Sequence, residues 1–515
     1  MQRNAEKNTI AVLDFGSQYS HLIVRRMREL GVYAELLSPE TPSEKLQEFS
    51  AIVLSGGPQN LSASDALQAD PKLYALGIPM LGICYGFQLM AHQLGGEVRA
   101  GKTREYGPAC VTVATRSPLF KGLPRSEPTW MSHGDQVTRV PNGFKITARS
   151  EVCPIAAMED RKRRLFGIQF HPEVKHTTHG MKVLQNFVRI TGAKHTWRLG
   201  KDWIDKTVAD VRAQVGMGRA LCALSGGVDS TVAAYLTHRA IGKKLTCVYV
   251  DTGLMRQGET EQIKRTFAKL PKLDFRVVHA EREFLKALKG VTDPEQKRKV
   301  IGRLFVRLFE REQTKLRRTD FLVQGTLYTD AITSGVSVGG KAAVIKSHHN
   351  VGGLPKDVAF RLIEPLRDLY KDEVRLLGRS LGVPEEIVSR QPFPGPGLAV
   401  RIIGEVTKEK LATLRKADAI FREELIVAGK AKQVAQYFAV LPDIRSVGVQ
   451  GDARTYGHLI ILRAITTADF MTADWARLPH TLLARASARI TNEVAGINRV
   501  AYDITSKPPG TVEWE

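Results

Sequence analysis

The chain has 515 residues, of which 43% are hydrophobic and 25% are charged, and its formal net charge at pH 7 is +22. A chain of this length does not fold around one hydrophobic core, so about three domains are expected, and the lack of any run of about 18 apolar residues excludes a membrane span. The basic residues form no cluster interleaved with aromatic residues and accompany no nucleic-acid-binding motif, so we expect most of the charge to lie on a solvated surface and nucleic acid not to be a partner.

From the N-terminus, short apolar runs alternate with helical patterns. TIAVLDF precedes the helical HLIVRRMRELG, and PMLGICYG precedes FQLMAHQLGG. Such alternation predicts βα units on a mostly parallel sheet. Further strands are expected between residues 108 and 170. A polar stretch at residues 192–203 is then predicted to be a linker.

A second alternating region begins near residue 220, with the apolar runs ALCAL, LTCVYVD and DFRVVH. The cluster PFPGPG at residues 392–397 cannot continue a helix or a strand and marks a third segment, in which helix and strand patterns mix. The predicted fold class is therefore α/β, with two doubly wound, mostly parallel-sheet domains followed by a smaller α+β domain. The predicted domains are residues 8–197, 198–390 and 391–515.

A cysteine lies between two glycines where a buried strand is predicted to meet a helix. The segment GICYG (82–86) has the arrangement of a nucleophile elbow, with cysteine in place of serine. The sharp turn exposes the sulfur of Cys84, and the helix N-terminus favours its thiolate. FHPE (170–173) offers His171 as a general base and Glu173 to orient the imidazole. The alternative is a structural cysteine beside an unrelated histidine.

Backbone N–H groups would also have to stabilise an oxyanion. SGGP (55–58) ends another predicted strand, and Tyr85 follows the cysteine. SGGP, GICYG and FHPE, in this order and each at a strand end, resemble the class I (triad) glutamine amidotransferases, which hydrolyse glutamine to glutamate and ammonia. The resemblance implies Cys84 as nucleophile, His171 as base and Glu173 as its orienting partner. It also implies that the oxyanion-hole amides belong to Gly57 and Tyr85.

The stretch SGGVDST (225–231) follows the apolar run ALCAL. It has neither the spacing nor the lysine of a Walker A loop, which excludes a kinase or GTPase loop. Its glycines, hydroxyls and helix start can hold an anion, whereas the carboxylate of Asp229 repels phosphate unless Mg²⁺ lies between them. Pyrophosphate with its metal is therefore a better guest than a single phosphate. The alternative is an ordinary helix N-cap.

The same stretch resembles the signature of the N-type ATP pyrophosphatases, the PP-loop family. Its members cleave ATP between the α and β phosphates to adenylate a carbonyl oxygen, and a nucleophile then displaces AMP. The resemblance implies Mg²⁺ with ATP, with Asp229 as the candidate ligand of the metal, and no tightly bound organic cofactor. The implied ATP-binding residues are Ser225, Gly226, Gly227, Val228, Asp229, Ser230 and Thr231.

Several further motifs extend over the chain from about Ile10 to Glu515. They are DFGSQY (14–19), MSHGD (131–135), DPEQKRKVIG (293–302), KSHHNVGGLP (346–355), PFPGPGL (392–398) and SKPPGTVEWE (506–515). Together with the two constellations they resemble the GMP synthetase family, glutamine-hydrolysing enzymes that convert xanthosine 5′-monophosphate (XMP) to GMP. The resemblance implies glutamine, ATP and XMP as substrates and a third domain that forms a homodimer.

By the same resemblance, Lys346 belongs to a lid over the adenylate. The residues that would line the XMP site are Arg298, Gln436, Asp452, Arg454, Lys507 and Glu513. Arginine and lysine suit the phosphate of a nucleotide, and carboxylates suit donors of its base or ribose. His348 and His349 have no partner spacing for a metal site, and we expect none there.

The chain departs from the family where its members usually read YPDVIES. Here residues 328–334 read YTDAITS, so Thr329 replaces a rigid proline and Thr333 replaces an acid. We expect a looser loop with one carboxylate fewer near the synthetase site. This departure and the charge of +22 leave open a weakened binding or regulatory protein, although intact Cys84, His171 and Glu173 argue against it.

A second alternative keeps both modules but changes the adenylated acceptor, or makes the chain a PP-loop RNA thiolase. Thiolation is disfavoured because no cysteine pair accompanies the loop: Cys222 and Cys247 both lie within predicted strands. The five cysteines contain no CxxC pair, which argues against a disulfide framework and a zinc ribbon. The N-terminal MQRNAEKNTIAVLDFG lacks an apolar signal region. We therefore expect a reduced, cytoplasmic protein.

Overall fold

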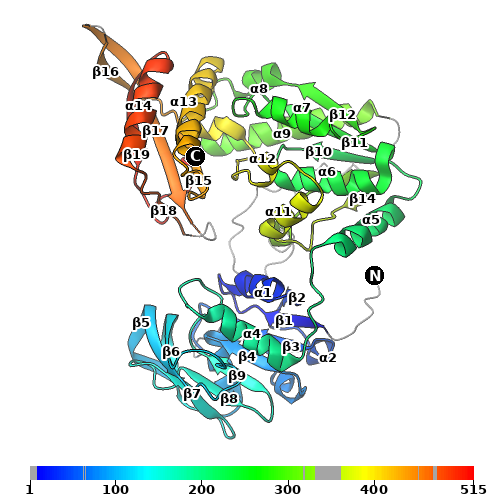
Figure 1. The fold of residues 1–515 in the computed structure, drawn as a ribbon, viewed down its shortest axis with the longest axis vertical. Coiled ribbons are helices and arrows are strands. Elements are labelled where there is room, and N and C mark those ends of the chain that lie inside the picture. Colours follow the sequence, from blue (N-terminus) through cyan, green and yellow to red (C-terminus); the bar gives the residue numbers. More distant parts are fainter. Residues whose placement is uncertain are drawn as a thin grey trace. The chain divides into compact units, whose positions relative to one another are not determined.

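The computed structural model describes residues 8–61, 63, 65–316, 319–330, 361–450, 452–467 and 472–515. Its internal contacts divide the chain into two units that meet in sequence between Arg198 and Leu199. We call them the N-terminal unit and the C-terminal unit and describe each by itself (Figure 1).

The N-terminal unit alternates strands and helices and then continues with strands. Its elements are β1 (Thr9–Leu13), α1 (Ser20–Glu29), β2 (Tyr33–Leu37), α2 (Ser43–Leu46), β3 (Ala51–Leu54), η1 (Pro71–Ala75), β4 (Met80–Ile83), α3 (Tyr85–Gln93), β5 (Glu97–Val113), β6 (Ser126–Arg139), β7 (Lys145–Arg149), β8 (Ala157–Asp160), β9 (Leu165–Ile168) and α4 (Gly180–Thr191).

The described strands of this unit form one sheet in the order β2-β1-β3-β4-β9-β8-β7-β5-β6. From β2 to β9 neighbouring strands are parallel, and from β9 to β6 they are antiparallel. All residues of β3 and β4 are buried, as expected for apolar strands covered on both faces. The carboxyl ends of parallel strands share one edge of a sheet, so the segments that follow β1, β3, β4 and β9 meet there.

The C-terminal unit contains the remaining elements. They are α5 (Lys201–Val215), β10 (Ala220–Leu224), α6 (Val228–Ile241), η2 (Gly242–Lys244), β11 (Leu245–Asp251), α7 (Glu259–Phe267), β12 (Asp274–His279), α8 (Glu281–Leu288), α9 (Pro294–Thr314), β13 (Phe321–Val323), β14 (Arg361–Ile363), α11 (Lys371–Ser380), α12 (Glu385–Val388), η3 (Gly397–Arg401), α13 (Lys408–Val427), β15 (Gln436–Val440), β16 (Arg445–Gln450), β17 (Ala453–Thr466), β18 (Asp474–Trp475), α14 (His480–Glu493) and β19 (Ile497–Asp503).

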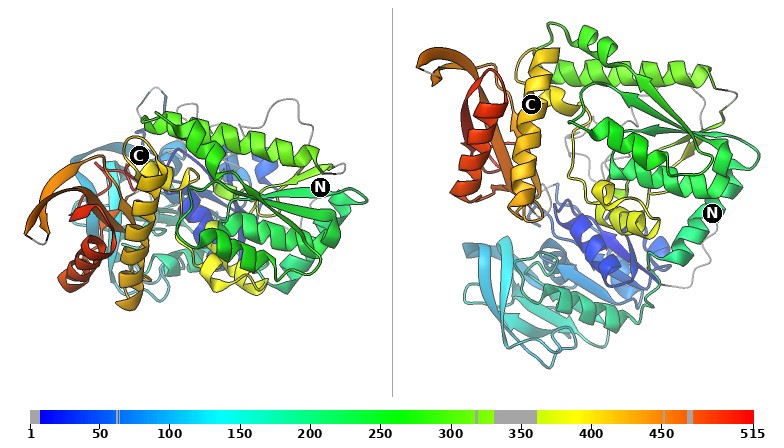
Figure 2. Two further views of the ribbon diagram at one scale, coloured as in Figure 1. Left: turned by 90° about the horizontal axis from the view of Figure 1, so that it is seen from above. Right: turned by 45° about the horizontal axis from the view of Figure 1, so that its top comes forward.

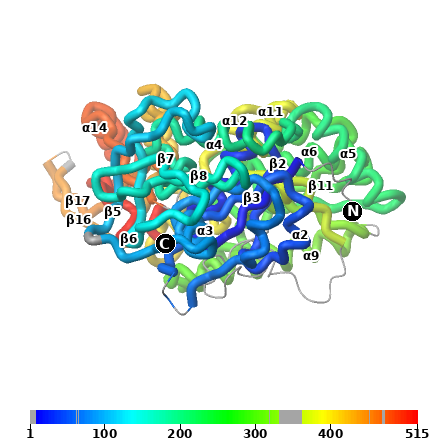
Figure 3. The backbone as a smooth tube through the Cα atoms, turned by 90° about the horizontal axis from the view of Figure 1, so that it is seen from below, coloured from blue at the N-terminus to red at the C-terminus, as the bar shows by residue number. Residues whose placement is uncertain are grey.

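Two sheets organise this unit. The first is parallel throughout, in the order β12-β11-β10-β13-β14. The second centres on β17, which is antiparallel to β15, β16 and β18 and parallel to β19. Helices α13 and α14 pack side by side along it (Figure 2). Strand β16 and the start of β17 project from the second sheet as a two-stranded ribbon, which we call the arm (Figures 1 and 3).

The predicted fold class is confirmed: two sheets rich in parallel strands precede an α+β segment. Buried residues of both C-terminal sheets belong to one hydrophobic cluster, which includes Val248 on β11, Phe309 on α9 and Phe421 on α13. The parallel sheet and the last segment thus share a core. The division predicted between residues 390 and 391 stays a prediction.

Candidate active sites

The backbone of Cys84 makes a strained turn between β4 and α3. Its φ is positive, at 51°, and its ψ is strongly negative. Residues other than glycine rarely adopt this combination. The flanking glycines are required because a Cβ at Gly82 would lie 2.6 Å from the carbonyl oxygen of Gly86. The turn is held by hydrogen bonds from the Cys84 N–H to the Ile168 carbonyl and from the Gly86 N–H to the Ser55 carbonyl, both 2.9 Å.

A histidine–glutamate pair lies next to this turn. His171 Nδ1 is 2.7 Å from Glu173 Oε1, and the two side chains are 3% and 0% exposed. Burial alone lowers the pKa of His171, but Glu173 and Cys84 outweigh it and raise that pKa to about 10. A Cβ at Gly56 would lie 3.1 Å from His171 Cε1 and 3.7 Å from the Cys84 Cβ. The three predicted residues of the triad are therefore brought together, beside SGGP.

The two residues predicted to supply the oxyanion-hole amides are neighbours. A Cβ at Gly57 would lie 2.6 Å from the Phe15 carbonyl oxygen and 3.3 Å from Tyr85 Cγ, so only glycine fits there. Tyr85 is the first residue of α3, and its N–H is among the donors that a helix leaves free at its N-terminus. The Tyr85 hydroxyl donates to the Leu67 carbonyl at 2.6 Å, which fixes the ring away from the turn.

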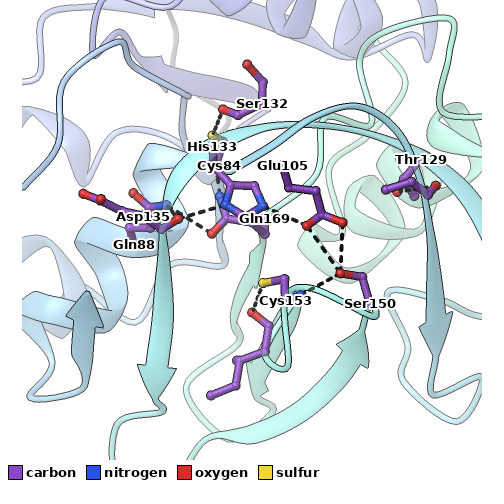
Figure 4. A network of polar contacts seen from close by, with 12 residues as sticks. Cys84, Gln88, Glu105, Thr129, Ser132, His133, Asp135, Ser150, Cys153 and Gln169 are labelled. Atoms are coloured by element: carbon purple, nitrogen blue, oxygen red, sulfur yellow. Dashed lines mark hydrogen bonds and ion pairs between the residues drawn. The ribbon is translucent and has the colours of Figure 1, made fainter. Parts of the chain in front are cut away.

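Polar groups that sequence reasoning did not assign approach the thiol. Cys84 Sγ lies 3.5 Å from the Ser132 carbonyl oxygen and 3.6 Å from Gln169 Nε2 (Figure 4). Gln88 Nε2 donates to Gln169 Oε1 at 3.1 Å. Two signals in the sequence could have suggested these residues. Gln169 immediately precedes FHPE, and Ser132 belongs to MSHGD, a motif that was given no role.

In the C-terminal unit, residues 225–227 form the turn between β10 and α6, and residues 228–231 form the first turn of α6. Gly226 has a φ of 78°, and α6 begins at Val228. The Ser225 hydroxyl accepts from the Gly227 N–H at 3.3 Å and lies 3.1 Å from the Ser230 hydroxyl. The Thr231 hydroxyl donates to the Gly227 carbonyl at 2.8 Å. The predicted residues therefore form one loop with hydroxyls at its edge and a helix N-terminus behind it.

Two basic residues distant in sequence flank this loop. Lys371 at the start of α11 forms an ion pair with Asp229 Oδ2, and Arg390 Nη1 donates to the Gly226 carbonyl at 2.5 Å. The other carboxylate oxygen of Asp229, Oδ1, is buried and has no hydrogen-bond partner among the described residues. Neither basic residue was predicted, because nothing local marks them. Their spacing from the loop is set by the fold.

Two of the residues predicted for the XMP site, Gln436 and Glu513, contact each other in the C-terminal segment. Gln436 Nε2 donates to Glu513 Oε1 at 2.7 Å. Arg401, which was not predicted, forms two parallel hydrogen bonds to the Glu513 carboxylate, 2.9 Å and 2.8 Å, and its side chain is fully buried. Beside Glu513 lies a pocket of about 220 Å³, lined by Arg463, Asp503, Thr505, Gly510, Thr511, Glu513 and Trp514.

Basic residues on α9 hold the last residue of the chain. Arg298 Nη2 donates to the Glu515 backbone oxygen at 2.5 Å. Lys297, fully buried, donates to Glu515 Oε2 and to the Ile402 carbonyl, both at 2.6 Å. Lys507 pairs with Ala473 through two backbone hydrogen bonds. Arg298, Gln436 and Glu513 thus belong to one polar neighbourhood at the C-terminus.

Asp452 and Arg454 lie elsewhere. Arg454 pairs with Val449 at the tip of the arm, whereas Gln436 pairs with Ile465 at the other end of β17. At the usual rise of an extended strand, Arg454 and Ile465 are roughly 36 Å apart along β17. Within one chain the structure does not bring Asp452 and Arg454 to Gln436 and Glu513.

Some predictions concern residues that the structure leaves undescribed. Lys346, His348, His349 and Thr333 lie outside the described residues, whereas Thr329 is described and follows the buried Tyr328. Across the described part of the chain, no group of three or more His, Cys, Asp or Glu side chains could hold a metal ion. No helix in the described ranges is long and apolar enough to cross a membrane.

Three family models match successive segments of the chain. Glutamine amidotransferase class-I matches residues 11–191, Thiamine biosynthesis protein (ThiI) matches 215–331, and GMP synthase C terminal domain matches 423–514. Curated relatives match over the whole length.

A protein named GMP synthase (glutamine-hydrolyzing) from Geobacillus kaustophilus (strain HTA426) is 56% identical over 509 residues, which cover 98% of this chain and 99% of the relative. The protein of that name from Symbiobacterium thermophilum is 56% identical over 514 residues, 99% of each chain. Another, from Clostridium novyi (strain NT), is 51% identical over 513 residues, again 99% of each.

Proposed function

The chain belongs to the glutamine-hydrolysing GMP synthases, and on that premise we propose how its own residues carry out the reaction. It is an ATP-dependent carbon–nitrogen ligase that takes its amido group from glutamine. XMP is adenylated by ATP, ammonia released from glutamine displaces AMP, and the products are GMP, AMP and pyrophosphate. Another adenylated acceptor is not favoured, because the relatives named for GMP synthesis match the chain over its full length.

The observation that carries the proposal is the strained Cys84 turn with a buried His171–Glu173 pair beside it. The Cys84 thiolate attacks the amide carbon of glutamine, and the N–H groups of Gly57 and Tyr85 stabilise the oxyanion. The His171 imidazolium, favoured by its raised pKa, gives its proton to the departing ammonia. Neutral His171 then activates water to hydrolyse the thioester, while Glu173 keeps the ring oriented.

Adenylation is assigned to residues 225–231 of the PP-loop. The N–H groups at the start of α6 and the hydroxyls of Ser225, Ser230 and Thr231 face the loop and suit the phosphates of ATP. The Oδ1 atom of Asp229 is buried and has no hydrogen-bond partner in the described part of the chain, and it fits a hard cation that prefers oxygen ligands. Bound there, Mg²⁺ would neutralise phosphate charge during pyrophosphate departure. Lys346 is proposed to cover the adenylate.

The XMP site is assigned to Arg298, Gln436, Lys507 and Glu513, with Asp452 and Arg454. Because the last two lie on the arm, we assign them to the XMP site of a second copy in a homodimer. Exposed apolar side chains on the arm support this: Val447, Val449 and Tyr456 are 58%, 72% and 65% exposed. Burying such side chains against a second copy is favourable.

Subunit complementation tests the shared site. Arg454→Ala and Glu513→Gln are each expected to abolish GMP formation as pure dimers. When the two unfolded variants are mixed and refolded together, about half of the dimers contain one chain of each variant. Each mixed dimer has one intact site out of two, so the mixture is expected to show about a quarter of the wild-type activity. An inactive mixture, with mixed dimers shown by mass spectrometry, would argue that each site is built within one chain.

The domain assignment and the compartment are proposals of the same kind. Residues 8–197 are assigned to glutamine hydrolysis, residues 198–390 to ATP cleavage, and residues 391–515 to XMP binding and dimerisation. Cytoplasmic location is supported by the cysteines, because all five are free thiols and four of them are buried.

Product analysis tests the division of labour. Purified protein is incubated with XMP, ATP and Mg²⁺, supplied with either glutamine or ammonium, and GMP, AMP, pyrophosphate and glutamate are quantified. Wild type is expected to form GMP from either nitrogen source. Cys84→Ala is expected to form GMP from ammonium alone, since its C-terminal unit is unchanged. Loss of both activities in Cys84→Ala would contradict the proposed division.

A further inference from the structure

A second histidine–glutamate pair lies beside Cys84, and the proposed reaction does not use it. Glu105 on β5 is the cross-strand partner of His133 on β6, and an irregular register between Ala100 and Glu105 sets the two opposite each other. His133 Nε2 lies 3.2 Å from Glu105 Oε2, and the two side chains are 3% and 12% exposed (Figure 4). Burying two titratable groups requires a compensating role for their polar atoms.

Hydrogen bonds connect this pair to the thiol. His133 Nδ1 and Gln88 Nε2 both donate to the backbone oxygen of Asp135, at 2.9 Å and 2.7 Å. Gln88 Nε2 also donates to Gln169 Oε1 at 3.1 Å, and Gln169 Nε2 donates to Cys84 Sγ at 3.6 Å. Gln88 and Gln169 are 4% and 0% exposed, so water does not compete for these bonds. Figure 4 shows the chain of contacts from Glu105 to the sulfur.

The neighbours of His133 fix its tautomer. The Asp135 backbone oxygen only accepts, so His133 Nδ1 carries a proton. His133 Nε2 lies 3.2 Å from Glu105 Oε2; burial lowers the pKa of His133, and the Glu105 carboxylate opposes that shift. The pair therefore keeps a donor aimed at the Asp135 backbone oxygen.

Glu105 is itself held in place. The Ser150 hydroxyl donates to Glu105 Oε1 and Oε2 at 3.2 Å and 3.3 Å, and it accepts from the Cys153 N–H at 2.8 Å. On the other side, Ser132 immediately precedes His133, and its carbonyl oxygen lies 3.5 Å from the Cys84 sulfur. A shift of His133 would thus move contacts of the thiol both through β6 and through the two glutamines.

We propose that the Glu105–His133 pair is a positioning device for glutamine hydrolysis. It fixes residues 132–135 of β6 so that the amide of Gln169 donates to the Cys84 sulfur and keeps the thiolate aligned for attack. The proposal rests on the proposed role of Cys84 as the nucleophile. Neither Glu105 nor His133 touches the reacting atoms; both act through residues 132–135 of β6 and through Gln88 and Gln169.

The test compares Glu105→Gln and His133→Gln, singly and together, with wild type. Misplacement of a nucleophile by a fraction of an ångström lowers the rate rather than binding, so kcat for glutamine hydrolysis is expected to fall about tenfold or more while KM for glutamine changes less than about threefold. The double variant is expected to be no slower than the slower single variant, because the two residues form one unit. Ammonium-dependent GMP formation is expected to stay within about twofold of wild type.

The rate at which iodoacetamide alkylates Cys84 provides a second readout, followed by peptide mass spectrometry because Cys110 is exposed and also reacts. It is expected to slow in each variant at neutral pH, since the thiolate loses a donor. Glu127→Gln is the matched control. Glu127 is another buried glutamate paired with a histidine of this unit, His179, at 2.7 Å. Its substitution is expected to leave kcat and alkylation within about twofold of wild type.

Wild-type kcat and alkylation in Glu105→Gln would overturn the proposal, and so would an equal loss in Glu127→Gln or in the ammonium reaction. If Glu105→Gln does not fold, Ser150→Ala tests the same pair through its anchor, and an unchanged kcat there would also overturn the proposal. The proposed role of Cys84 as the nucleophile is tested separately: glutamine-dependent GMP formation that persists in Cys84→Ala would contradict it.

Discussion

Replacing Glu173 by glutamine isolates the electrostatic part of the proposed triad. In the wild type, burial opposes the charged form of His171, but Glu173 and Cys84 raise its pKa to about 10. Against an ordinary value of about 6.5, this corresponds to on the order of 5 kcal/mol in favour of the imidazolium. Glutamine keeps the shape of the side chain without its charge. In Glu173→Gln the attraction of the carboxylate for the imidazolium is lost, so the pKa of His171 falls.

The effect on stability has a defined dependence on pH. A histidine whose pKa is raised by folding adds stability that is fully present below its unfolded pKa, about 6.5, and is lost as the pH rises through the folded pKa. For His171 the second value is about 10. The contribution removed in Glu173→Gln is then at most about 4 kcal/mol at pH 7 and about 1.5 kcal/mol at pH 9.

Thermal unfolding of wild type and Glu173→Gln, recorded in parallel from pH 6 to pH 10, measures this contribution. The Tm of the variant is expected to lie below that of the wild type at pH 6 and to approach it toward pH 10. Glutamine hydrolysis is expected to fall about 10³-fold or more, as when the orienting carboxylate of a triad is lost, with ammonium-dependent GMP formation retained. A Tm deficit that stays constant over this pH range would refute the reasoning.

Three other substitutions test separate parts of the structure. Asp229→Ala is expected to reduce XMP-dependent pyrophosphate release at least about 100-fold and to spare basal glutamine hydrolysis. Retained pyrophosphate release would show that Asp229 has no role in the ATP site. Gly86→Ala places a Cβ against the Leu54 carbonyl, so glutamine hydrolysis is expected to be lost and the Tm to fall, and wild-type values would contradict the packing described. In Arg401→Lys the lysine cannot form both hydrogen bonds to the Glu513 carboxylate, so KM for XMP is expected to rise about tenfold while glutamine hydrolysis is unchanged. An unaltered KM would show that Arg401 does not contribute to XMP binding.

The local geometry of the two candidate sites could be predicted because it is encoded within a few neighbouring residues. The Cys84 turn follows from glycines two residues away on either side, and the PP-loop lies within residues 225–231. Both fall at strand ends, where a parallel sheet brings successive loops to one edge. The fold class was predictable for the same reason, because strand and helix periods alternate within short windows.

Contacts between distant residues could not be predicted in this way. Asp229 pairs with Lys371, 142 positions away, and Arg401 with Glu513, 112 positions away. The place of Arg454 depends on the length of β17, which sets it far from Gln436 along one strand. The shared core of the two C-terminal sheets likewise arises from packing that no single window of sequence contains.

The dihedral angles of Cys84 set chemistry against thermodynamic stability at one position. Glycine adopts a positive φ with little loss of stability, and the φ of Cys84 is positive. Any side chain there is destabilising by about 1–3 kcal/mol. Cys84→Gly should therefore melt at a higher temperature than the active protein, unlike Cys84→Ala, which keeps a Cβ. A lineage that ceased to use glutamine would gain stability from that one substitution. Retention of cysteine at this turn is thus a mark of continuing selection for hydrolysis rather than of folding.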